Sequence, residues 1–153
     1  MGLIFKKHQR FKLVSAAHLF LIKGPRILMT RRFKTGYEDG NYGVPSGHLD
    51  GGEQATAAMF REAWEEIGIE ISPADLTCVH TMHRNACSHG SERIDFFFLC
   101  KSWTGEPRIK EPDKCDDLIW SFLWLLPDNT IPYIRQAIEK YYKERENYSE
   151  FGW

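Results

Sequence analysis

The chain has 153 residues, of which 42% are hydrophobic and 27% are charged, and its formal net charge at pH 7 is −1. This composition is that of an ordinary folded protein, and it excludes disordered, collagen-like and coiled-coil chains. The near-neutral charge provides no overall positive field that would gather nucleic acid or an acidic membrane, so any binding of phosphate must depend on a local site.

Runs of apolar residues separated by turn residues predict the first half of the fold. Strands are predicted at residues 13–22 and 27–31, joined by a Gly-Pro turn. Residues 33–52 are rich in Gly, Tyr and Asp and form a long loop, and long loops in compact domains are usually functional. A helix is predicted over residues 54–67, with Gly68 in the position that ends it.

The second half of the chain predicts three further strands and a closing helix. The strands lie at residues 76–83, 93–103 and 118–126, with a polar loop over 104–117. Residues 131–142 carry apolar side chains at helical spacing. Strands in a mixed order, with one helix in the middle and one at the end, predict an α/β sandwich.

The sequence also carries expectations about domain organisation and compartment. A chain of this length fits one domain over residues 1–153, with residues 1–12 as an N-terminal extension. The cysteines at positions 78, 87, 100 and 115 are widely spaced, which favours reduced thiols in the cytoplasm over disulfides or a zinc site. No apolar stretch is long enough to span a bilayer or to serve as the core of a signal peptide.

Three glutamates gather on one face of the helix predicted at residues 54–67. At about 100° per residue, Glu62, Glu65 and Glu66 fall within an arc of roughly 100°, and apolar residues occupy the opposite face. Adjacent carboxylates repel one another unless a cation neutralises them, and Mg²⁺ prefers such oxygen ligands. A solvated acidic face, the commoner reason for charge on a helix, is the alternative.

The residues that flank these glutamates favour the metal site. Gly47, Gly51 and Gly52 allow the backbone to approach closely just before the helix. Glu53 lies in the first turn, where the helix dipole favours an acid. Arg61 lies beside the glutamates and is near enough to orient them.

Residues 47–69 resemble the Nudix box, the signature of the Nudix hydrolases. The box reads G-x5-E-x7-R-E-apolar-x-E-E-x-G-apolar, and its constrained positions are filled here by Gly47, Glu53, Arg61, Glu62, Ala63, Glu65, Glu66, Gly68 and Ile69. Ser46 stands where many members have a second Gly, and we expect this small residue to have little effect. The order of strands and helices around the box is also similar to that of the family, which implies an α/β/α sandwich with a mixed sheet between helices.

The resemblance implies a role for each residue of the box. The principal metal ligands would be Glu62 and Glu66, and Glu65 would be a further ligand or a support. Gly47 would offer its backbone carbonyl to the metal. Mg²⁺, or Mn²⁺ as a substitute, would neutralise phosphate oxygens and lower the pKa of the water that attacks phosphorus. The residues that orient this cluster would be Glu53 and Arg61.

The general base is either a glutamate of the box or an acid from a later loop. The segment Glu111-Pro112-Asp113-Lys114 resembles a Glu-Pro-x-Lys segment of relatives that hydrolyse nucleoside triphosphates. This makes Glu111 the candidate for an auxiliary metal ligand or base. A loop acid beside a proline, with no catalytic role, is an equal alternative.

Further residues are candidates for binding the substrate. Arg31 and Arg32 follow the second predicted strand and would hold a terminal phosphate, unless they form a solvated strand end. His80 and His83 are assigned to one strand face, and His83 would touch the base, although structural histidines are commoner. The aromatic candidates for stacking on a base, which in isolation are more often packing residues, are Tyr37, Tyr42 and Trp120.

The resemblance implies a pyrophosphohydrolase that cleaves a nucleoside diphosphate linked to a group X. The absence of other subfamily markers, together with residues 111–114, predicts a (deoxy)nucleoside triphosphate that is cleaved to a monophosphate and pyrophosphate. ADP-ribose or a nucleotide sugar, the 5′ end of an RNA, and a non-catalytic binding module stay open as alternatives. The predicted partner is a small nucleotide in the cytoplasm, the near-neutral charge disfavours nucleic acid and membranes, and family grounds alone leave a homodimer open.

Overall fold

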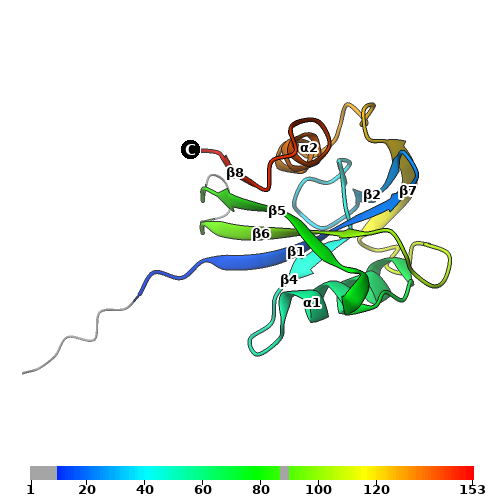
Figure 1. Cartoon of the computed structure of the whole chain (residues 1–153), viewed down its shortest axis with the longest axis horizontal. Helices are drawn as coiled ribbons and strands as arrows, with labels where there is room; N and C mark the ends of the chain where they lie inside the picture. Colours follow the sequence, from blue (N-terminus) through cyan, green and yellow to red (C-terminus); the bar gives the residue numbers. More distant parts are fainter. Residues whose placement is uncertain (1–9, 87–89) are drawn as a thin grey trace, which may run out of the picture.

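The computed structural model describes residues 10–86 and 90–153, which form a mixed β-sheet between two helices (Figure 1). Residues 1–9 of the predicted N-terminal extension and Cys87 lie outside the described residues. The strands are β1 (Val14–Lys23), β2 (Arg26–Arg32), β3 (Tyr42–Gly43), β4 (Ser46–His48), β5 (Thr77–Arg84), β6 (Arg93–Cys100), β7 (Cys115–Phe122) and β8 (Tyr148–Phe151). The helical segments are α1 (Ala55–Glu62), η1 (Ala63–Ile67), η2 (Pro73–Asp75), α2 (Pro132–Glu139) and η3 (Lys140–Glu144).

Strand β1 is central to the sheet because three other strands pair with it. It runs parallel to β6 from Val14 opposite Arg93 to Leu21 opposite Cys100. It is antiparallel to β4 near its start and to β2 at its end. The sheet extends on one side through β5 and then β8, and on the other side β3 and β7 both pair with β2.

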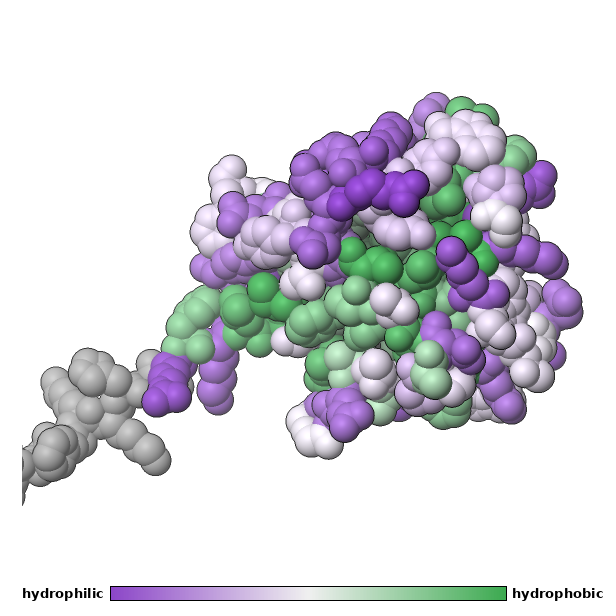
Figure 2. Space-filling view, in the orientation of Figure 1, coloured by the Kyte–Doolittle hydropathy of each residue, from purple (hydrophilic) through white to green (hydrophobic). Residues whose placement is uncertain are grey.

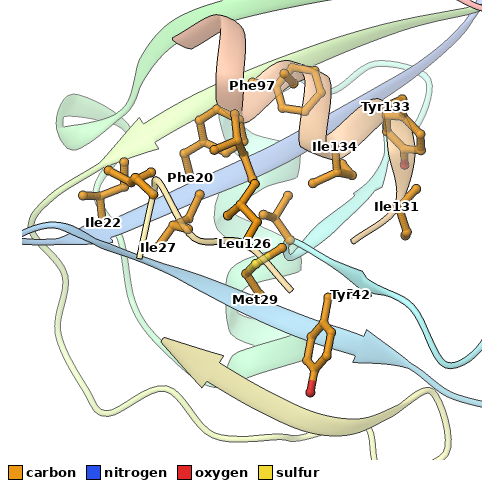
Figure 3. Packing of buried hydrophobic residues seen from close by; sticks show 14 of the residues in the cluster. Phe20, Ile22, Ile27, Met29, Tyr42, Phe97, Leu126, Ile131, Tyr133 and Ile134 are labelled. Carbon is orange, nitrogen blue, oxygen red and sulfur yellow. The ribbon is translucent and has the colours of Figure 1, made fainter. Parts of the chain in front are cut away.

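The side chains of β1 alternate between two hydrophobic clusters, one on each face of the sheet. Phe20 points into the cluster beneath α2, where it lies with Phe97 of β6 and Ile134 of α2 (Figure 3). Leu19 points into the cluster beneath α1, which includes Met59 of that helix. Both faces of the central strand are therefore covered, which explains its nearly continuous apolar sequence. On one face of the molecule, apolar residues gather across the middle, along the strands (Figure 2).

Helix α1 continues directly into the π-helical turn η1, and together they cover one face of the sheet. The chain leaves this helix at Gly68, which has a left-handed φ of 70°. The loop between β6 and β7 caps the same end, since the Arg108 N–H donates to the Ile67 carbonyl at 3.0 Å and the Lys110 N–H donates to the Glu66 carbonyl at 3.1 Å. The residues that the helix buries against the sheet are Ala58, Met59, Ala63 and Ile67.

The predicted α/β sandwich with a mixed sheet is confirmed. The helix predicted at residues 54–67 corresponds to α1 and η1, and its predicted end at Gly68 is correct. The strands β3, β4 and β8 were not predicted, because they are short and pair with distant parts of the chain. The strand predicted at 118–126 was wrong in extent, since the chain turns after β7 and the Leu125 N–H donates back to the Phe122 carbonyl at 3.0 Å. None of the helices in residues 10–86 and 90–153 has the length and apolar character needed to cross a bilayer.

Replacing Gly68 with alanine should lower the free energy of unfolding by about 1–2 kcal/mol, because a Cβ is strained at this left-handed position. The added Cβ would also lie 2.8 Å from Lys110 Cδ. Urea denaturation measures the loss. Gly51→Ala is the matched control, since a Cβ there meets no described atom within 4 Å and the φ of Gly51 is not positive. Equal unfolding free energies for G68A and the wild type would contradict this account.

Candidate functional site

A cleft of about 560 Å³ opens between the helix formed by α1 and η1, which we call the box helix, β4 and the loop that joins β6 to β7. It is lined by acidic and basic side chains from segments far apart in the sequence. Glu53 does not line the cleft but contacts Arg61, and His83 lies outside it. The predicted site residues that the cleft brings together are Arg31, Arg32, Gly47, Arg61, Glu62, Glu65, Glu66 and Glu111.

Gly47 and Glu62 are in such close contact that a side chain at position 47 would displace the Glu62 carboxylate. Strand β4 pairs with β1, which places Gly47 opposite Ala17 and turns its backbone toward α1. A Cβ built on Gly47 would lie 1.9 Å from Glu62 Oε1. The Glu62 carboxylate, whose side chain is 14% exposed, therefore occupies the space that a side chain at position 47 would need.

Glu66 is held against the same strand by a backbone hydrogen bond. The Ser46 N–H donates to Glu66 Oε2 at 2.9 Å. Only the backbone of Ser46 is used, so this contact does not require the glycine that many family members have there. Burial, reinforced by the negative charges of Glu62 and Glu111, raises the pKa of Glu66 to about 8.

Arg61 neutralises and orients the acidic cluster. Its guanidinium donates to Glu62 Oε1 at 2.6 Å, to Glu53 Oε1 at 2.8 Å and to Glu65 Oε2 at 3.5 Å. Hydrogen bonds from Arg61 and from the Asp50 N–H lower the pKa of Glu53. Glu53 lies before the helix, which begins at Ala55, and not in its first turn as expected, so it fixes Arg61 to that loop. Arg61 in turn fixes the carboxylates.

The residues of this cluster fit a divalent cation. The available donors are carboxylate oxygens, which hard cations such as Mg²⁺ prefer. Burial also raises the pKa of Glu62, so in the absence of a cation the site disfavours the ionised form of both Glu62 and Glu66. Within the described residues, no three acidic, His or Cys side chains already surround one point. Glu62 faces Arg61 and Glu66 faces the Ser46 N–H, so the carboxylates would have to turn to share a cation.

Glu111 approaches the box glutamates from the loop between β6 and β7. The contacts of this loop with the end of the helix, described above, place Glu111 close enough for its charge to raise the pKa of Glu62 and Glu66. Lys114 Nζ donates to Glu111 Oε1 at 2.9 Å. This hydrogen bond, with smaller contributions from the charges of Glu66 and Glu62, raises the pKa of Lys114. The loop therefore brings one acid and one cation to the cluster.

Both predicted phosphate-binding arginines line the cleft. Arg31 donates to Asp116 through Nε at 2.7 Å and through Nη2 at 3.2 Å. Arg32 donates to the Tyr37 carbonyl at 2.7 Å and to Thr35 Oγ1 at 3.1 Å. Each guanidinium is therefore held in place by a neighbouring segment.

The two histidines of β5 do not share a face, contrary to the expectation, because residues three positions apart on a strand point in opposite directions. His80 is buried beside Phe97, and its Nε2 lies 2.8 Å from Ser149 Oγ. His83 packs against Trp153, with ring centroids 4.8 Å apart, and its Nε2 lies 3.2 Å from Glu92 Oε2. Neither histidine lines the cleft.

Of the three aromatic candidates, Tyr37 lines the cleft. The Tyr42 hydroxyl donates to Asp117, and the residue is buried in the cluster beneath α2. Trp120 stacks with Trp103 at 6.0 Å against the cluster beneath α1. These two rings are therefore packing residues.

The cleft also contains a histidine and an arginine that the sequence analysis did not identify as site residues. His18 on β1 and Arg84 at the end of β5 line the cleft and converge on the buried Asp95 of β6. A sequence signal was present for Asp95, a charged residue in the otherwise apolar run of residues 94–100. Such residues are rarely buried without a partner.

Comparison with known proteins identifies relatives along nearly the whole chain. The family model described as the NUDIX domain matches residues 12–143. A MutT NUDIX hydrolase from Burkholderia pseudomallei is similar, with 29% identity over 84% of this chain and 97% of that chain, and a TM-score of 0.77. A MutT protein from Methanosarcina mazei shares the fold, with 18% identity over 90% of this chain and 99% of that chain, and a TM-score of 0.74. A bifunctional NMN adenylyltransferase/ADP ribose pyrophosphatase from Francisella tularensis, complexed with AMP and a Mn ion, shares the fold at 21% identity over 90% of this chain and 43% of that chain, with a TM-score of 0.69.

Replacing Gly47 with alanine should leave stability within about 1 kcal/mol of the wild type, because the group that must move is the flexible end of Glu62. Displacing a residue that shapes a metal site typically lowers metal affinity by about 10- to 100-fold. The Mg²⁺ concentration that gives half of the full stabilisation should therefore rise by that factor. Mg²⁺ titration of the thermal melting temperature measures it. Gly51→Ala is the control, and an unchanged Mg²⁺ response in G47A would contradict the assignment.

Replacing Glu66 with glutamine should stabilise the metal-free protein at pH 7 by roughly 1–3 kcal/mol. The pKa of Glu66 rises from 4.5 to about 8 on folding, so wild-type stability should fall as pH increases between these values. E66Q lacks this dependence. Thermal melts from pH 4 to pH 9 in EDTA compare the two proteins, with Glu70→Gln at an exposed position as control. Parallel curves for E66Q and the wild type would refute the prediction.

Proposed function

Since the chain belongs to the Nudix hydrolase family, and is therefore a pyrophosphohydrolase, we propose that its substrate is a (deoxy)nucleoside triphosphate. The products would be a nucleoside monophosphate and pyrophosphate, and the cofactor would be Mg²⁺. The observation that carries the proposal is the convergence of Glu62, Glu66 and Glu111 at one cleft of about 560 Å³. A cleft of this size suits a small-molecule substrate.

The cations of the cleft support a substrate with several phosphates. Arg31, Arg32 and Lys114 line the same cleft as the glutamates, and each is oriented by a hydrogen bond to a neighbouring group. Guanidinium groups bind phosphate oxygens through two parallel hydrogen bonds, and an ammonium binds them as a point charge. A triphosphate chain would thus find fixed cations beside the acidic cluster.

The acidic cluster would supply the cation site. Glu62, Glu65, Glu66 and the carbonyl of Gly47 would hold Mg²⁺, or Mn²⁺ in its place. When bound, the cation neutralises phosphate oxygens and lowers the pKa of a bound water. Arg61 keeps Glu62 and Glu65 on one side of the cleft before the cation arrives.

Glu111 is the proposed proton acceptor. A bond forms between the oxygen of the attacking water and phosphorus, while the bond from phosphorus to the bridging oxygen breaks. The electron pair of the broken bond leaves with pyrophosphate, and the proton of the water passes to the Glu111 carboxylate. Lys114, which donates to Glu111 Oε1 at 2.9 Å, holds that carboxylate in the cleft.

The wild-type protein with Mg²⁺ should release pyrophosphate from nucleoside triphosphates, and Glu111→Gln should lower kcat by about 10²- to 10⁴-fold, the range of a lost general base. A panel of triphosphates, ADP-ribose, nucleotide sugars and triphosphorylated RNA, with separate readouts for phosphate and pyrophosphate and with Mn²⁺ compared, measures both effects.

Glu106→Gln is the matched control, since Glu106 lies exposed in the same loop and does not line the cleft. It should retain wild-type kcat. Turnover restricted to ADP-ribose or to nucleotide sugars would overturn the proposed substrate. A wild-type kcat in E111Q would overturn the role of Glu111 alone.

A further inference from the structure

The cleft has beside it a charged pair that the proposed phosphate chemistry does not use, since Arg84 lines the cleft and its partner Asp95 is buried. Arg84 donates to both carboxylate oxygens of Asp95, from Nε to Oδ2 and from Nη2 to Oδ1 at 3.3 Å. Its guanidinium also lies over the ring of Tyr133, 3.7 Å from the centroid. Asp95 is fully buried, whereas Arg84, whose side chain is 8% exposed, reaches the cleft. The guanidinium is therefore fixed on two sides.

His18 holds Asp95 from the opposite side. His18 Nε2 lies 3.1 Å from Asp95 Oδ1, and the imidazole stacks on Phe97 with ring centroids 4.7 Å apart. His18 is only 3% exposed, and its Nδ1 has no hydrogen-bond partner among the described residues. A buried nitrogen without a partner is costly, so this polar residue is best explained by its contact with Asp95.

This arrangement reserves one donor group of Arg84 for a ligand. Asp95 accepts hydrogen bonds from Nε and Nη2 of Arg84, while Nη1 of Arg84 makes no hydrogen bond within residues 10–86 and 90–153. Asp95 is fully buried, whereas the Asp116 side chain that holds Arg31 is 32% exposed and screened by water. The charge of Arg84 is therefore balanced more completely than that of Arg31, and its Nη1 suits an uncharged acceptor better than a phosphate.

The surroundings of Arg84 have the character of a nucleobase site. The residues Val44, Ile131 and Ile134 line the same cleft and provide apolar walls. A nucleobase has apolar faces, and carbonyl oxygens and ring nitrogens along its edge accept hydrogen bonds. A fixed donor beside an aromatic ring, in a cleft that also has apolar lining, therefore matches a base better than it matches a sugar or a phosphate chain.

We propose that Arg84 binds an acceptor atom of the substrate's nucleobase, and that Asp95 and His18 are positioning residues for Arg84. This inference rests on the proposed function, because a nucleotide substrate is what brings a base into the cleft. The phosphates of that nucleotide would lie against the acidic cluster and the cations Arg31, Arg32 and Lys114.

The test compares two substrates that differ only in the base. For the wild type and each variant, kcat/KM is measured for a nucleoside triphosphate and for ribose 5-triphosphate, which has no base. Arg84→Lys should lower the ratio of the two values by about 10- to 100-fold, the worth of one hydrogen bond from a charged donor. Asp95→Asn and His18→Phe should lower the same ratio by smaller factors, with kcat/KM for ribose 5-triphosphate unchanged within about twofold.

Two further variants control for folding and for general loss of charge. The double variant R84M/D95N removes both charges together, so it leaves no buried charge unpaired, and it should lose base discrimination while retaining a cooperative thermal transition. Arg26→Lys alters an arginine that lies over Phe122 and does not line the cleft, and it should keep the wild-type ratio.

An equal fall in kcat/KM for both substrates would overturn the inference, since it would mean that Arg84 acts on the phosphates or only on the fold. If the wild type hydrolyses no triphosphate, the proposed substrate fails, and the inference is then judged by calorimetric binding of a nucleoside monophosphate and of ribose 5-phosphate in Mg²⁺. Weaker binding of the nucleotide alone in R84K would support the role of Arg84. Equal changes for the two ligands would refute it.

Discussion

The close approach of the Gly47 backbone to the Glu62 carboxylate is the contact on which the site depends. It requires β4 to pair with β1, helix α1 to lie against that edge, and residue 47 to have no side chain. A carboxylate in this position is partly desolvated, and Glu66 beside it is more so. Arg61 compensates for part of this cost through its hydrogen bonds with Glu62 and Glu65. The geometry is thus one that a cation would relieve further.

The helix and its glutamates could be predicted because the information is local. The spacing of Glu62, Glu65 and Glu66 sets a helix face, and Gly68 has the conformational freedom to end the helix. The short strands β4 and β8 could not be predicted in the same way. They pair with β1 and β5 across long stretches of chain, and three or four residues carry too little periodicity to indicate a strand.

Among the site residues, the sequence identified those of the motif and the two arginines after the second predicted strand. It missed Arg84, Asp95 and His18, which meet only in the folded chain. Arg84 and Asp95 are neighbours because β5 and β6 pair in antiparallel register, and His18 reaches them because β1 runs parallel to β6. The position of His83 outside the cleft has a related reason. Side chains alternate between the two faces of β5, so Arg84 lines the cleft while His83 packs against Trp153.

The loop between β6 and β7 is attached to the last carbonyls of the box helix through the N–H groups of Arg108 and Lys110. Loop and helix end therefore share hydrogen bonds that neither can satisfy alone. An exchange of this loop between homologues would consequently disturb the glutamates unless the graft carried both anchoring positions with it. In chimeras designed to alter substrate preference, the exchanged segment should therefore include positions 108 and 110. The donor loop then brings the residues that bond to the end of the helix.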